Sequence, residues 1–239
     1  MFLNKKITLY FTCLFFTIAT LAQTSKNHDV YEAYDAIVSQ ENTGLYNGTE
    51  FKDIYNNTDK THRYYNLFDF SRGTVVYDGQ LYSNVLLKYD LFEDQLITKS
   101  DDNMSVFSVQ LISGKVSNFT LYTHDFVRLS NIDLNGNKNG FYEVGFKSEK
   151  VELYIKNVKT KKEKAVSSGV QYRFKSDNFY MVYYNGHYKV VNAYRDFKDL
   201  MPDQYQQVKD FYKSYRALYK SNRNSFMIKL VTYLDGSLL

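Results

Sequence analysis

Residues 62–192 alternate between short apolar or aromatic runs and tight turn signals, without helical spacing between them. The clearest signal is Asp78-Gly79, which separates the apolar runs at 75–77 and 80–82. Asp-Gly tolerates the positive backbone angles of a two-residue type I′ turn, so these runs are expected to form a hairpin. Short strands joined by tight turns predict an α+β fold that is mainly β: an antiparallel meander sheet, either an open barrel or a sandwich.

Further strand pairs are predicted in the same way. Residues 85–91 are paired with 95–98, and 141–146 with 151–155. Residues 106–112 and 115–122 flank Ser113-Gly114, and 170–174 are paired with 179–184 across 175–178. Asn185-Gly186 then turns 180–184 against 187–191.

The chain after residue 192 changes its period, which predicts a helical part at 193–239. Apolar residues at 205, 208, 211, 215 and 218 step by three or four, which indicates one amphipathic helix over about 203–220. Pro202 suits its start, because the first turn of a helix needs no backbone N–H partner. A last helix begins at Asn224 or Ser225 and ends at Gly236. Each helix has one apolar side and is expected to pack on the sheet.

The first residues predict export. Lys5 and Lys6 precede an apolar run at 7–18, and small residues at 20 and 22 favour a cleavage site, so 1–22 resemble a secretory signal peptide. That run is shorter than the roughly 20 residues of a membrane-spanning helix. We therefore expect a single exported domain over 23–239, periplasmic or on the cell surface, without an integral membrane span. Its first element is a short helix at 29–39, capped by Asp29.

Composition narrows the partners. The chain has 24 tyrosines, 18 phenylalanines, no tryptophan and one cysteine, Cys13, which leaves with the signal peptide. Loss of Lys5 and Lys6 lowers the formal net charge from +4 to +2, which argues against nucleic acid as a partner. The one basic cluster, 156–164, is expected to be a solvated hairpin loop, with an anionic membrane face or an acidic partner as the alternative.

Candidate chemistry is sparse. His28, His62, His124 and His187 have no partner at metal-ligand spacing, and His124 and Asp125 are strand neighbours that point to opposite faces. Asp90, Glu93 and Asp94 gather near one turn, where hydrated acids are the ordinary outcome. Asp133, Asn135, Asn137 and Asn139 precede Gly140, but the sixth and twelfth places of an EF-hand loop do not match. No catalytic, cofactor-binding or metal-binding residue is predicted.

Several segments carry a resemblance that spans most of the chain after the signal peptide. Residues 42–48, 76–85 and 88–90, then 140–144, a basic hairpin, 184–188 and a terminal helix are similar to a recurring group of exported proteins of Bacteroidetes. The resemblance implies a periplasmic or cell-surface setting in a bacterium with two membranes. It assigns no catalytic residue.

The sequence favours a non-enzymatic binding or accessory protein of the cell envelope. The excess of tyrosine suits a sheet face or a sheet–helix junction that holds an envelope protein, a small apolar molecule or a glycan. One alternative is a hydrolase of envelope polysaccharide with acids among Asp90, Glu93 and Asp94, which requires two carboxyl groups across one cleft. A purely structural envelope protein is the other.

Overall fold

The computed structural model describes residues 44–55, 61–101, 107–130, 139–167 and 169–238. The predicted signal peptide at 1–22 and the predicted helix at 29–39 lie outside these residues, as does most of the segment tested as a calcium loop. Within the described part, the mainly β prediction is confirmed: eleven strands form one antiparallel sheet.

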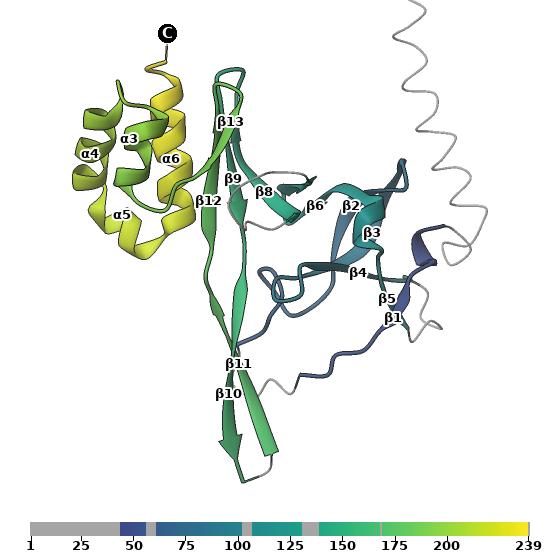
Figure 1. The fold of residues 1–239 in the computed structure, drawn as a ribbon. Coiled ribbons are helices and arrows are strands. Elements are labelled where there is room, and N and C mark those ends of the chain that lie inside the picture. The colour runs from purple at the N-terminus through teal and green to yellow at the C-terminus, as the bar shows by residue number, and fades with distance from the viewer. Residues whose placement is uncertain (1–43, 56–60, 102–106, 131–138, 168, 239) are drawn as a thin grey trace, which may run out of the picture.

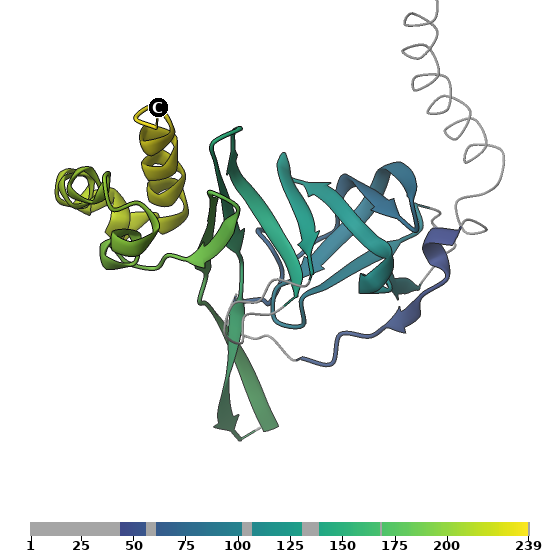
Figure 2. The ribbon, with the colours of Figure 1, turned by 45° about the horizontal axis from the view of Figure 1, so that its top comes forward.

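The sheet is open, with β1 and β13 at its edges, and it coils strongly along its length (Figures 1 and 2). Its spatial order is β1-β5-β4-β3-β2-β6-β7-β8-β9-β12-β13. The strand bounds are β1 Thr49–Phe51, β2 Ser71–Tyr77, β3 Gln80–Asp90, β4 Gln95–Lys99, β5 Ser108–Gln110, β6 Val116–Leu121, β7 His124–Leu129, β8 Gly140–Lys147, β9 Val151–Lys156, β12 Phe179–Tyr184 and β13 His187–Val190. Three-residue 3₁₀ turns, η2 (Gly44–Tyr46) and η3 (Ser113–Lys115), precede β1 and β6.

Both predicted two-residue turns are present. Asp78 and Gly79 have φ of 52° and 81°, and Asn185 and Gly186 have φ of 50° and 80°. These values are the positive angles that a type I′ hairpin requires. β2 therefore pairs with β3 and β12 pairs with β13 as expected.

Two predicted pairings are wrong. The strand at 170–174 does not pair with 179–184, because it belongs to β11 (Gly169–Ser176), whose partner is β10 (Lys159–Val166). β5 and β6 also do not pair, since η3 separates them and sends β6 to β2, while β5 lies between β1 and β4. In both places a local turn signal was present, but the partner strand is distant in sequence.

β9, β10, β11 and β12 form one long hairpin with an unchanged register. Val151 lies opposite Tyr184, Lys156 opposite Phe179, Lys159 opposite Ser176 and Val166 opposite Gly169. Its inner half belongs to the large sheet, and its outer half, β10–β11, projects from the body as a separate two-stranded arm (Figure 1). The basic cluster at 156–164 is therefore mostly strand, which corrects the expectation of a solvated loop.

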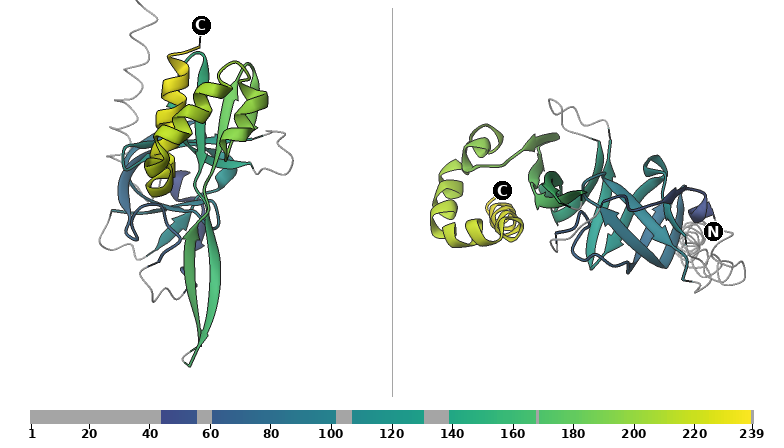
Figure 3. Two further views of the ribbon diagram at one scale, coloured as in Figure 1. Left: turned by 90° about the vertical axis from the view of Figure 1, so that its left-hand side faces the viewer. Right: turned by 90° about the horizontal axis from the view of Figure 1, so that it is seen from below.

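One face of the sheet carries two hydrophobic cores. The strand core is built mainly from β2–β7 and includes Val75, Phe119 and Phe126, all under 2% exposed. The helix core lies between β9, β12 and the C-terminal helices and includes Ile155, Tyr180 and Leu230. The predicted packing of the helices on the sheet is thus confirmed, and the helices cover one end of the molecule while β1–β6 form the other (Figure 3).

The helical part begins with a 3₁₀ turn, η4 (Tyr194–Asp196), followed by α3 (Phe197–Leu200). The helix predicted over 203–220 is broken into α4 (Tyr205–Ser214) and α5 (Arg216–Ser221), because Tyr215 leaves the helical conformation between them. α6 (Arg223–Asp235) matches the predicted last helix. None of the helices in the described residues combines the length and apolar character that a bilayer crossing needs.

Candidate functional site

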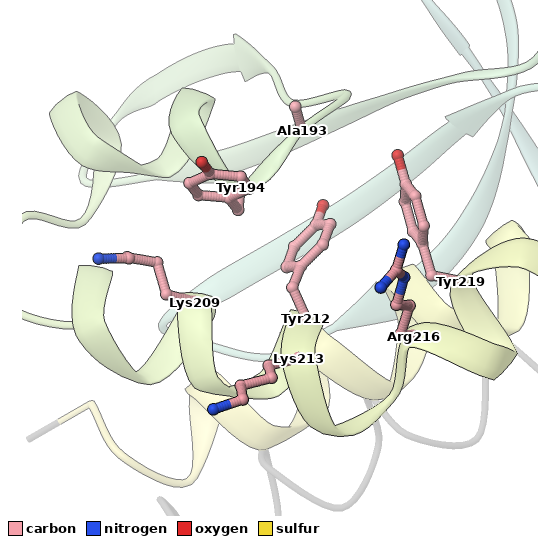
Figure 4. Close-up of a pocket in the computed structure, with 7 residues that line it drawn as sticks. All are labelled: Ala193, Tyr194, Lys209, Tyr212, Lys213, Arg216 and Tyr219. Atoms are coloured by element: carbon pink, nitrogen blue, oxygen red, sulfur yellow. The ribbon is translucent and has the colours of Figure 1, made fainter.

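A pocket of about 430 Å³ lies between η4 and the helices α4 and α5 (Figure 4). This volume falls within the range of about 300–1,000 Å³ that is typical of small-molecule sites. Tyrosines and basic residues dominate its wall, which consists of Ala193, Tyr194, Lys209, Tyr212, Lys213, Arg216 and Tyr219. We call it the tyrosine pocket.

The helix core positions the aromatic wall. Tyr212 and Tyr219 are seven residues apart, close to two helical turns, so they fall on the same side of the α4–α5 pair despite the break between these helices. Both rings pack on Phe226 of α6, at centroid distances of 4.6 and 5.1 Å. Tyr194 completes the wall from η4, with its ring 5.9 Å from that of Tyr212. The rings therefore stand on a buried base.

The rim of the tyrosine pocket is positively charged. Lys209, Lys213 and Arg216 are exposed and follow one another at helical spacing along α4 and α5. Among the described residues that line the pocket, none is acidic. Burial raises the pKa of Tyr212, so its hydroxyl stays neutral and adds no negative charge. The arrangement thus offers aromatic surface for a flat ring and cations for a negatively charged group.

A second hollow of about 380 Å³ lies beside the turn after β3, and we call it the acidic pocket. Asp90, Glu93, Arg63 and Tyr55 are among the residues that line it. Two of the three acids considered from sequence, Asp90 and Glu93, therefore share one pocket. Asp94, the third acid, does not line the acidic pocket.

Asp90 is 1% exposed, so the expectation of a hydrated turn acid is wrong for this residue. Its Oδ1 accepts hydrogen bonds from the backbone N–H groups of Phe92 and Glu93, and its Oδ2 lies 3.0 Å from Arg63 Nη1. Burial raises the pKa of Asp90 to about 6, although the Arg63 guanidinium and the two amides act in the opposite direction. Asp90 therefore holds the turn from a buried position.

Glu93 and Asp94 have separate partners. Glu93 accepts a hydrogen bond of 3.2 Å from the hydroxyl of Tyr55 at the rim of the acidic pocket. Asp94 accepts a hydrogen bond of 2.5 Å from the Tyr89 hydroxyl and pairs with Lys156 Nζ at 2.7 Å. Lys156 is only 4% exposed, so Asp94 serves to neutralise a buried ammonium group.

The three histidines in the described residues do not assemble into a common site. His62 packs against the rings of Tyr64 and Phe68, and burial lowers its pKa. His187 is exposed at the start of β13, and His28 lies outside the described residues. His124 contacts Glu143, with 2.8 Å between Nδ1 and Oε1. Within the described ranges, no group of three or more His, Cys, Asp or Glu side chains is placed to hold a metal ion.

Sequence reasoning missed Glu143, which is 3% exposed in the middle of an apolar row. The row crosses consecutive strands through Phe119, Phe126, Glu143, Ile155 and Tyr180. Besides His124, the Tyr65 hydroxyl and Asn157 Nδ2 donate to its carboxylate. A charged residue within the apolar run at 141–146 was the available signal. Its partners come from distant segments that only the sheet register brings together.

Comparison of the chain with models of protein families, with curated proteins and with solved structures finds no match.

Proposed function

We propose that this chain is an exported, non-catalytic binding protein of the cell envelope that holds a small, ring-bearing anion in the tyrosine pocket. The observation that carries the proposal is the wall of that pocket, where three tyrosines meet three cations without an acidic neighbour among the described lining residues. The export part rests on the signal-peptide pattern at 1–22 and on the resemblance to exported proteins of Bacteroidetes.

The pocket chemistry selects the ligand class. The faces of Tyr194, Tyr212 and Tyr219 offer apolar surface to a sugar or aromatic ring, while their hydroxyls can hydrogen-bond its substituents. A carboxylate, phosphate or sulfonate on that ring would lie near Lys213 and Arg216, where charge-assisted hydrogen bonds are stronger than neutral ones. This conclusion refines the sequence prediction of a small apolar or glycan ligand by adding a negative charge.

A pair of matched fluorescent probes tests the proposal. 8-Anilinonaphthalene-1-sulfonate and N-phenyl-1-naphthylamine share one aromatic skeleton, but only the first carries a negative charge. The native protein should bind the sulfonate more tightly, and the double variant Lys213→Gln/Arg216→Gln should weaken its binding by at least tenfold, because a hydrogen bond to a charged group contributes about 1.5–3 kcal/mol.

The double variant Lys198→Gln/Lys220→Gln is the charge-matched control, since these two exposed cations do not line the pocket. Its sulfonate affinity should stay native. Circular dichroism must show that all variants keep the native fold, because the probes also bind exposed cores. Equal affinity for the two probes, or equal losses in both double variants, would refute the proposal.

A second candidate is supported by the acidic pocket. Asp90 and Glu93 both line it, and a carboxyl group with a pKa of about 6 is suited to general acid catalysis near neutral pH. The corresponding function is hydrolysis of envelope polysaccharide, with Asp90 as the acid and Glu93 as the second carboxylate. Release of reducing ends from isolated envelope polysaccharide tests it.

Glu93→Gln should abolish such release, while Glu149→Gln, an exposed acid that does not line this pocket, should leave it intact. If the native protein releases no reducing ends, the hydrolase hypothesis is eliminated. If the probe experiment is negative as well, binding of an envelope protein and a purely structural role are the predictions from sequence that remain.

A further inference from the structure

The β10–β11 arm has one strongly basic face. In an antiparallel pair, residues directly opposite each other share a face, and every second residue along a strand returns to it. The register therefore places four cations of the arm on the same face: Lys162, Lys164, Arg173 and Lys175. All four are exposed. The other described positions on this face are Thr160, Val166, Gly169 and Gln171, so it holds no acidic residue of the arm.

The opposite face of the arm turns toward the body. Phe174, 5% exposed, packs on Tyr55 and Phe92 with ring centroids 5.7 and 5.5 Å apart. Lys161 lies on this face and pairs with Glu163 at 3.1 Å. This inner face therefore attaches the arm to the body through ring contacts.

The basic face gathers positive charge along both strands of the arm. Lys162 lies directly opposite Arg173, and like charges in directly opposed positions destabilise an antiparallel pair. An anionic surface near the arm would attract these exposed cations. The face is therefore complementary in charge to a negatively charged partner.

The tip of the arm is uncharged and partly apolar. Ala165 lies opposite Val170, which is 45% exposed, and Val166 lies opposite Gly169. Eight residues per strand extend the arm by about 27 Å. This reach exceeds the Debye length of about 8 Å at physiological salt, so the arm can meet a charged surface that the body does not touch.

We propose that the β10–β11 arm docks on an anionic membrane surface. The valines at the tip enter the interface between headgroups and acyl chains, and the cations behind them contact lipid phosphates. A lipid surface uses both features of the arm, since interfacial binding combines buried apolar area with attraction to anionic lipids. A soluble polyanion would use the basic face but would leave the valines in water, and it is therefore the weaker interpretation.

Vesicle co-sedimentation tests this inference, with phosphatidylcholine vesicles prepared with and without phosphatidylglycerol. The native protein should bind only the anionic vesicles, and added salt should weaken the binding. Lys162→Gln/Lys164→Gln should weaken it about 25-fold, because each cation near an anionic surface contributes about fivefold. Val166→Ser/Val170→Ser should weaken it several-fold without changing the charge.

Lys198→Gln/Lys220→Gln again serves as the charge-matched control and should bind vesicles like the native protein. The arm variants should also bind the fluorescent sulfonate normally, which separates this inference from the function proposed for the tyrosine pocket. Native binding to neutral vesicles, an unchanged affinity of the lysine variant, or a loss in the control equal to that in the arm would overturn the inference. So would arm-dependent binding to dextran sulfate without any binding to vesicles.

Discussion

Glu143 is the residue whose replacement should destabilise the fold most sharply for its size. It interrupts an apolar row between Phe126 of the strand core and Ile155 of the helix core. Three donors satisfy its carboxylate: Asn157 Nδ2 at 2.6 Å, His124 Nδ1 at 2.8 Å and the Tyr65 hydroxyl at 3.2 Å. A buried carboxylate is tolerated only with such partners, so carboxylate and donors depend on one another.

These contacts set the expected loss in the free energy of unfolding when Glu143 is replaced. Glu143→Ala removes three hydrogen bonds to a charged acceptor and leaves the buried Asn157 amide unpaired, which should cost about 4 kcal/mol. Half-exposed His124 can exchange its lost partner for water, which limits the loss. Glu143→Gln keeps the shape and one accepting oxygen, so its cost should be about 2 kcal/mol.

Urea unfolding followed by far-ultraviolet circular dichroism measures both values, and Glu149→Gln is the matched control because that acid is exposed on the turn after β8. The native protein and the Glu149→Gln control should be equally stable, Glu143→Gln should be less stable, and Glu143→Ala should be the least stable. If the alanine variant loses less than about 1 kcal/mol, the carboxylate does not hold the seam between the two cores, and the reasoning fails.

Three further predictions concern single residues. The Asp90 carboxyl should titrate near pH 6 in the folded protein, as measured by ¹³C NMR. Because its pKa is raised from 3.8, its contribution to stability should fall as the pH rises from about 4 to about 6. A titration midpoint below pH 4.5 contradicts this prediction. Gly73→Ala should cost about 2 kcal/mol in urea unfolding, because the added Cβ would collide with the Thr120 carbonyl of the adjacent strand; an unchanged midpoint contradicts it. Asn222→Ala should lower the free energy of unfolding by about 1 kcal/mol through loss of the cap hydrogen bond to the Ser225 amide, 3.0 Å long, and Asn222→Asp should restore it.

Local sequence signals were sufficient to predict the two hairpins that have two-residue turns. Asp78-Gly79 and Asn185-Gly186 specify their turns through backbone angles that few other residue pairs adopt, and the neighbouring strands follow from adjacency. Ser113-Gly114 has a similar composition but forms part of a 3₁₀ turn, after which the chain continues to a distant partner. Strand order beyond adjacent hairpins depends on non-local packing, which a local pattern does not encode.

The candidate sites were predictable only in part. The helical period at 203–220 identified Val208 and Phe211 as buried, and both are. It also placed Tyr215 on the apolar side, but this residue ends α4 and is 38% exposed. The tyrosine pocket was not foreseen, because its wall combines two helices with Tyr194 from the connection after β13.

The unchanged register of the hairpin from 151 to 184 has a consequence for folding kinetics. A hairpin of this kind closes from its tip, so each new pair fixes few additional residues and the loop-closure entropy stays small. Pairing of β2 with β6 must instead bring Tyr77 to Val116, and closing a flexible loop of that length costs about 3 kcal/mol in chain entropy. We therefore expect the hairpin over 151–184 to form first, and the strand core to be completed later on the β8 side of β9.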